Sequence, residues 1–137
     1  MSVQLAMSVP ELDIYARLGE DGFDRLAGAF YARVATDDLL GPMYRGALGH
    51  EGGSMEDARL RLREFLIQRF GGPGRYSQAR GHPRLRARHM PFAIDAAAAG
   101  RWVAIMDGAM ADAEIDEDVR ATLRPYFVQT ANFMVNR

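Results

Sequence analysis

The stretch Arg84-Leu85-Arg86-Ala87-Arg88-His89-Met90-Pro91-Phe92 sets a lone histidine in a short arginine-rich segment between two long amphipathic patterns. It closes a connection of about twenty residues that begins at Gly71-Gly72-Pro73-Gly74, in which only 84–89 is predicted to form a short helix. Connections of this length inside a compact domain are usually functional or disordered. Its apolar and aromatic side chains argue against disorder, so we expect a functional segment.

On both sides of this segment, apolar residues recur every three or four positions, which places them on one face of a helix. Four long stripes follow this pattern: Phe23, Leu26, Ala27, Phe30, Tyr31 and Val34; Met55, Ala58, Leu62, Phe65 and Leu66; Trp102, Ile105, Met106, Ala109, Met110 and Ala113; Val119, Leu123, Tyr126, Phe127, Thr130 and Met134. A shorter helix is expected over 9–17, ended by Gly19, and Asp116 is expected to cap the last helix. No segment alternates like a half-buried strand, so the sequence predicts an all-α fold.

A second long connection, Gly41 to Ser54, contains Pro42 and several glycines. Glycine is conformationally permissive and proline interrupts helical hydrogen bonding, so this composition predicts a mobile loop rather than a helix.

The length of 137 residues predicts a single domain, 11–137, preceded by a flexible tail over 1–10. The tail lacks the basic start and long apolar core of a signal peptide, and no window resembles a membrane span. With a formal net charge of −1, the protein has no overall positive charge that would attract nucleic acid or an anionic membrane.

Two residue types are missing from the sequence, and their absence excludes several chemistries. Every basic residue other than histidine is arginine, which excludes lysine Schiff bases and a lysine general base. The absence of cysteine excludes disulfides, thiolate nucleophiles and iron–sulfur clusters, and suits the reducing cytoplasm, where we expect the protein to reside.

His89 is the best candidate for a metal ligand among the three histidines. His82 precedes Pro83, which favours an extended backbone, and His50 lies in the glycine-rich connection. The histidines lack the spacing of zinc sites, and a surface or core role is the alternative for any single histidine. A haem changes this balance, because the porphyrin supplies four nitrogens and the protein needs to offer only one axial imidazole.

Arginines and aromatic residues are the other candidates for a haem site. Guanidinium groups match the geometry of carboxylates, so Arg86, Arg88 and Arg61 are candidate partners for the haem propionates, although exposed arginines are often only a solvated face. Three aromatics with a polar hydrogen could bind a diatomic ligand or simply fill the core: Tyr31, Tyr44 and Trp102.

Several segments of the sequence resemble the truncated haemoglobins, and specifically their group II. They are Phe30-Tyr31-Ala32-Arg33-Val34-Ala35, Pro42-Met43-Tyr44, Arg61-Leu62-Arg63-Glu64-Phe65-Leu66, Gly71-Gly72-Pro73, and the highly specific stretch from Arg80-Gly81-His82-Pro83 through His89-Met90-Pro91-Phe92. The resemblance implies a shortened globin, a two-over-two helical sandwich around haem. The chain departs from the family in two places. Gly19 and Gly22 do not form the usual pair of adjacent glycines near the start, and the stretch from Gly46 to Gly53 is longer than usual.

The resemblance also assigns roles to individual residues. It implies that His89 is the proximal iron ligand, that Tyr31, Tyr44 and Trp102 surround the bound ligand with Leu62, and that Ala58 replaces a distal histidine or glutamine. Trp102 is the signature of the group. The haem is then expected to contact Arg61, Leu62, Phe65, Tyr76, His82, Arg86, Arg88, Phe92 and Met106.

The function that follows is a haem b protein that reversibly binds oxygen, and also nitric oxide or carbon monoxide, as a carrier or sensor. One alternative is an enzyme that uses bound oxygen to oxidise nitric oxide, or that reduces peroxide. Such an enzyme requires an external reductase, because the sequence carries no reductase domain. Another is a haem-free helical interaction module that binds an acidic partner. The protein is expected to be a monomer or a homodimer.

Overall fold

The computed structural model describes residues 9–51, 53–85, 89 and 93–137, and no strand occurs among them. The predicted all-α class is therefore confirmed. The elements whose bounds lie within the described residues are a 3-10 turn and helices of six to 23 residues: η1 Glu11–Asp13, α2 Ile14–Thr36, α3 Leu40–Glu51, α4 Met55–Arg69, α5 Arg75–Arg80, α7 Ala96–Asp112 and α8 Glu117–Met134. Within the described part of the chain, no helix is long and apolar enough to cross a membrane.

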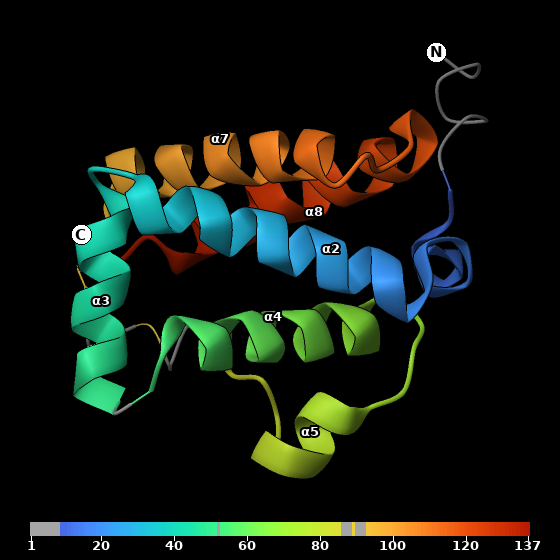
Figure 1. Cartoon of the computed structure of the whole chain (residues 1–137), viewed down its shortest axis with the longest axis horizontal. Coiled ribbons are helices and arrows are strands. Elements are labelled where there is room, and N and C mark those ends of the chain that lie inside the picture. The colour runs from blue at the N-terminus through green and yellow to red at the C-terminus, as the bar shows by residue number, and fades with distance from the viewer. Residues whose placement is uncertain (1–8, 52, 86–88, 90–92) are drawn as a thin grey trace.

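The long helices form two layers (Figure 1). Helix α2 packs on both α4 and α7, and α7 packs on α8. Helix α3 stands across one end of this arrangement, and α5 lies beneath α4. Large aromatic side chains from α2, from the end of α4 and from α8 are fully buried in the core: Phe23, Phe30, Phe70 and Phe127. The four long stripes predicted from the sequence are thus helices α2, α4, α7 and α8.

The start of the chain folds back on the end of α4. Gly19, at φ 67°, interrupts α2, so the short first helix ends where the sequence predicted. The backbone N–H of Tyr15 donates to the carbonyl of Phe70 at 3.0 Å. Most of the predicted flexible tail, 1–8, lies outside the described residues, whereas Val9 packs against the core and its carbonyl accepts a hydrogen bond from the Thr122 hydroxyl.

The expectation of a loop from Gly41 to Ser54 is wrong, because most of this stretch forms α3. Pro42 lies in the first turn of the helix, where the missing N–H has no intrahelical partner to lose. The carboxylate of Asp37 accepts hydrogen bonds from the N–H groups of Leu39 and Leu40, at 3.0 and 2.7 Å, and fixes the start. Leu40 and Leu48 are buried, and this packing outweighs the cost of the glycines, about 1 kcal/mol each.

The expectation that only 84–89 would be helical in the second connection is also wrong, since α5 precedes it. A helix of this length is unstable alone, and side chains of α4 hold it in place. The Gln68 amide donates to the Ser77 hydroxyl at 2.7 Å and accepts from the Ser77 N–H at 2.9 Å. The Arg75 guanidinium pairs with the Glu64 carboxylate. Leu85 and His89 are both helical, as the sequence predicted.

The expected side-chain cap on α8 is not formed. Asp116 occupies the N-cap position without a capping hydrogen bond. Its carboxylate instead accepts from the Arg17 guanidinium at 3.3 Å, and Asp118 does so at 2.7 Å. An ion pair to the first helix has therefore replaced the local cap, and it ties the start of α8 to the start of α2.

Candidate functional site

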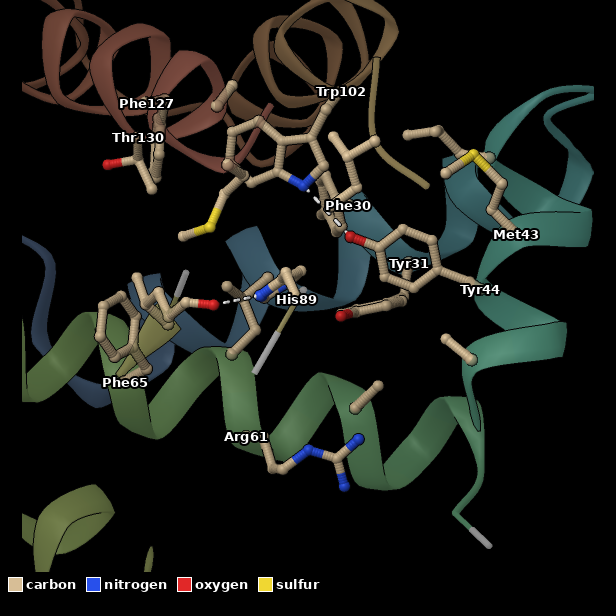
Figure 2. Close-up of a pocket in the computed structure, with 18 of the residues that line it drawn as sticks. Phe30, Tyr31, Met43, Tyr44, Arg61, Phe65, His89, Trp102, Phe127 and Thr130 are labelled. Atoms are coloured by element: carbon tan, nitrogen blue, oxygen red, sulfur yellow. Dashed lines mark hydrogen bonds between the residues drawn. The ribbon is translucent and has the colours of Figure 1, made fainter. Parts of the chain in front are cut away.

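A cavity of about 280 Å³ lies inside the helical assembly and takes residues from every long helix (Figure 2). Its lining is mostly apolar and aromatic. Such a volume is close to the lower end of the range for small-molecule sites, about 300–1,000 Å³. The walls come from the facing sides of α2, α3, α4, α7 and α8, together with Leu85, His89 and Ile94.

His89 borders this cavity, and a backbone contact selects one tautomer of its neutral ring. Its Nδ1 lies 2.6 Å from the backbone oxygen of Leu85, as the dashed line in Figure 2 shows. A carbonyl oxygen can only accept, so Nδ1 carries the hydrogen and Nε2 of the neutral ring carries the lone pair. Metal-bound histidines are oriented by the same second hydrogen bond. The ring is therefore prepared to ligate through Nε2.

Three polar aromatics border the same cavity from three helices. Trp102 of α7 donates its Nε1 hydrogen to the hydroxyl of Tyr44 in α3 at 3.2 Å. The ring centroids of Tyr44 and Tyr31, the latter in α2, are 5.6 Å apart. Phe30 packs against all three rings, with centroids 5.0 Å from Tyr31 and 5.4 Å from Trp102. These contacts fix the positions of the rings that carry the polar hydrogens.

The Tyr44 hydroxyl remains protonated over the physiological range. Burial raises the pKa of Tyr44 to about 12, while hydrogen bonds with Trp102 and Tyr31 act in the opposite direction. Because the oxygen already accepts from Trp102, the hydroxyl combines an accepted hydrogen bond with a hydrogen of its own to donate. The cluster is thus neutral and rich in hydrogen-bond donors.

Helix α4 supplies one wall of the cavity and part of its charge. Ala58 is buried and adds no polar atom, and Phe65 meets the ring of Tyr76 edge-on at 5.6 Å. Arg61 lines the cavity, as does Arg80, whose guanidinium carbon lies 5.8 Å from the centre of the Tyr76 ring. Cationic groups therefore border an otherwise apolar space.

Most of the predicted site residues come together at this cavity: Tyr31, Tyr44, Ala58, Arg61, Leu62, Phe65, Tyr76, His89 and Trp102. Two do not line it in the described part of the chain. Met106 is completely buried in the core, and His82 is exposed, with its Nδ1 accepting from the Arg84 N–H at 3.1 Å. Three predicted residues, Arg86, Arg88 and Phe92, lie outside the described residues.

Sequence reasoning missed the contribution of α8 and, apart from Tyr44, that of α3. On α3, the spacing of Leu40, Tyr44 and Leu48 is helical and predicts a shared face, but the glycines favoured a loop. On α8, Tyr126, Thr130 and Met134 were part of an apolar stripe, and a stripe cannot by itself separate core positions from cavity walls. Both sets line the cavity.

The comparisons with known proteins agree with this geometry. The bacterial-like globin family matches residues 13–136. Group 2 truncated hemoglobin YjbI of Bacillus subtilis is 37% identical over 123 residues, covering 90% of this chain and 88% of the relative. Two-on-two hemoglobin-3 of Arabidopsis thaliana is 36% identical over 131 residues, covering 95% of this chain and 73% of the relative.

Solved structures match in fold as well. A thermostable hemoglobin from Thermobifida fusca has a TM-score of 0.79 at 42% identity, covering 89% of this chain and 95% of the other. A truncated oxygen-avid haemoglobin from Bacillus subtilis has a TM-score of 0.81 at 34% identity, covering 89% and 98%. The fold and its enclosed cavity are those of a truncated globin. The chain belongs to the bacterial-like globin family, and within it to the group II truncated haemoglobins.

Membership of this family supports haem-based binding of diatomic gases in general, and the donor set fits a haem. A porphyrin needs one axial imidazole and an apolar enclosure. Within the described residues, no group of three or more histidine, aspartate or glutamate side chains is placed to hold a bare metal ion. His89, oriented by Leu85, is the imidazole at the cavity.

Proposed function

We propose that this protein holds haem b in the described cavity, with Nε2 of His89 as the axial ligand, and that it reversibly binds oxygen, as well as nitric oxide and carbon monoxide. The observation that carries the proposal is the hydrogen bond from His89 Nδ1 to the Leu85 carbonyl, which leaves Nε2 as the lone-pair nitrogen of a ring that borders the cavity. The haem supplies reversible coordination of the gas, and the protein supplies binding and orientation.

The side chains of Tyr31, Tyr44 and Trp102 select and retain the gas in this proposal. Bound oxygen is a polar acceptor, and the cluster offers hydroxyl and indole hydrogens in a space lined mostly by apolar side chains. Tyr44 stays neutral because burial raises its pKa, so the hydroxyl keeps its hydrogen at any physiological pH. Ala58 offers no hydrogen bond, which leaves this task to the aromatics.

The positively charged side chains hold the two haem carboxylates. Arg61 lines the cavity and is the proposed partner contributed by α4, with Arg86 and Arg88 as the partners contributed by the segment before His89. Each such pair at a partly exposed rim is worth only about 0.2–1 kcal/mol, so the axial bond and apolar contacts provide most of the retention.

The proposed role is that of a carrier or sensor, from which the gas leaves unchanged. Turnover of oxygen with nitric oxide, or reduction of peroxide, is the alternative, and it requires an external electron donor. Nitric oxide consumption by the oxygen-bound protein, followed with and without an added reductase, separates the two. Sustained consumption that depends on the reductase supports the enzyme, and consumption of one equivalent supports the carrier.

The axial ligand is tested by absorption spectra of the ferric, ferrous, oxygen-bound and carbon-monoxide-bound forms of the unmodified protein and of His89→Ala. We expect His89→Ala to lose haem or to bind it without the imidazole signature. His82→Ala is the matched control, because His82 is exposed and does not border the cavity. A normal imidazole-bound spectrum in His89→Ala, with its loss in His82→Ala, would overturn the proposal.

A further inference from the structure

The C-terminal residues beyond α8 pair with the segment that follows His89. The backbone N–H of Asn136 donates to the carbonyl of Ile94 at 2.8 Å, and the N–H of Arg137 donates to the same oxygen at 3.2 Å. The side chain of Asn136 adds a third contact, because its Oδ1 accepts from the Ile94 N–H at 2.9 Å. The end of the chain is therefore attached to Ile94 by both main chain and side chain.

The same carboxamide also reaches the backbone of His89. Its Nδ2 donates to the His89 carbonyl oxygen at 3.2 Å, across 47 positions of sequence. In a continuing helix this oxygen would accept from the N–H of Ala93, but Ala93 lies outside any helix. Asn136 thus donates to a carbonyl at the end of the short helix that contains His89, as a C-terminal cap does.

From these contacts we infer that Asn136 is a positioning residue for His89. Its two amide atoms bind the two ends of one short segment, the carbonyl of His89 and the N–H of Ile94, and so fix the distance between them. The Nδ1 hydrogen bond to Leu85 sets the rotation of the imidazole ring from the preceding turn. Asn136 fixes the backbone that carries this ring, from the following turn.

The position of Asn136 links His89 to the wall of the cavity that α8 contributes. Thr130, Ala131 and Met134 of α8 line the cavity, as does Ile94, and Asn136 lies two residues beyond Met134. A shift of the end of α8 is therefore transmitted to the backbone of the axial histidine through hydrogen bonds rather than through loose packing.

An amide is required for this arrangement because one side chain must both donate and accept. Aspartate has nearly the same shape and keeps the acceptor for Ile94, but at neutral pH it places a carboxylate oxygen against the His89 carbonyl. Alanine removes both contacts. Asn136→Asp and Asn136→Ala thus remove one and two side-chain hydrogen bonds without touching the cavity lining.

The inference rests on the proposed function, and the experiment separates the two. The iron–histidine stretching band of the ferrous, ligand-free protein is recorded by resonance Raman spectroscopy for the unmodified protein, Asn136→Asp, Asn136→Ala and Asn132→Asp. Asn132 is the matched control, because it is exposed on the last turn of α8 and receives the same chemical change. Transfer of haem to an excess of apomyoglobin is timed for the same proteins.

We expect the band to shift or broaden in both Asn136 variants and to remain unchanged in Asn132→Asp. Haem transfer should become about two- to tenfold faster for each net hydrogen bond lost. A band that is present and identical in all four proteins contradicts the positioning role alone. An unmodified protein without an iron–histidine band contradicts the proposed axial ligand, and the positioning role with it.

Discussion

Replacing Trp102 with phenylalanine removes one polar hydrogen from the cavity and leaves most of the packing in place. The centroid of the indole ring lies 5.4 Å from that of Phe30, in a tilted contact, and 5.6 Å from that of Phe127, in an edge contact, and a phenyl group can keep both contacts. The hydrogen bond from Nε1 to the Tyr44 hydroxyl is lost. The variant therefore tests the donor rather than the bulk of the side chain.

The magnitude of the effect follows from the proposed hydrogen bond between this donor and bound oxygen. A neutral hydrogen bond contributes about 0.5–1.5 kcal/mol net, so loss of one donor to bound oxygen accelerates dissociation by about two- to tenfold. The Trp102 hydrogen bond also lowers the pKa of Tyr44, so in Trp102→Phe that pKa should rise above its value of about 12. Carbon monoxide is a weaker acceptor, and its release should change less.

The measurement is the oxygen dissociation rate by stopped flow, for Trp102→Phe, Tyr44→Phe and the double variant. Because Trp102 and Tyr44 share one hydrogen bond, the two effects should not add, and the cycle gives their coupling. Tyr15→Phe is the control, since the Tyr15 hydroxyl donates to Glu20 away from the cavity. If all three cavity variants release oxygen at the unmodified rate with haem fully bound, these residues only fill the core.

Three further predictions concern stability and haem retention. Asp37 caps α3, so Asp37→Ala should lower the free energy of unfolding, measured in urea, by about 1–2 kcal/mol. Asp38→Ala is the control: its side chain is 91% exposed, and the substitution should change the free energy of unfolding by less than about 0.5 kcal/mol. The Leu40 N–H and Arg101 hold the pKa of Asp37 below its ordinary value, so its contribution is present above about pH 4 and is lost as the pH falls through the lower folded value. Gly71→Ala should destabilise the protein by about 2–4 kcal/mol, because φ is 102° and the new Cβ overlaps the Leu12 carbonyl of η1. Gly46→Ala, with open space around the new Cβ, should stabilise the protein by about 0.5–1 kcal/mol. Thermal unfolding measures both effects. Arg61→Met should speed haem loss modestly, and the difference should shrink at high salt; an unchanged rate at low salt would contradict a propionate contact.

The long helices could be predicted because their signal is periodic and global. Each apolar stripe spans three or more turns, and most of the buried residues of α2, α4, α7 and α8 fall on those stripes. Helix α3 could not be predicted in this way, because glycine and proline are local signals against a helix. It forms because Asp37 caps its start and because Leu40 and Leu48 are buried. The cap is local, whereas the burial depends on helices α4 and α7, which come later in the sequence.

The candidate site was predictable to the extent that its residues are chemically unusual. A lone histidine before Met90-Pro91 and a tryptophan on an apolar stripe each stand out in the sequence. The α8 residues that line the cavity do not, since Thr130 and Met134 fit a core stripe equally well. Asn136 could not be found at all from sequence, because its role depends on a hydrogen bond to a backbone carbonyl 47 positions away.

The donors at the cavity are positioned by the same contacts that stabilise the fold. Trp102 packs on Phe30 and Phe127, which are fully buried core residues, while its Nε1 hydrogen bonds Tyr44. Fixed donors need not reorganise when a ligand arrives, so their hydrogen bonds contribute more to binding than those of mobile side chains. Substitutions that remove the whole ring, such as Trp102→Ala, therefore combine a loss of stability with a loss of ligand contacts. Only a variant that keeps the ring and removes the hydrogen separates the two.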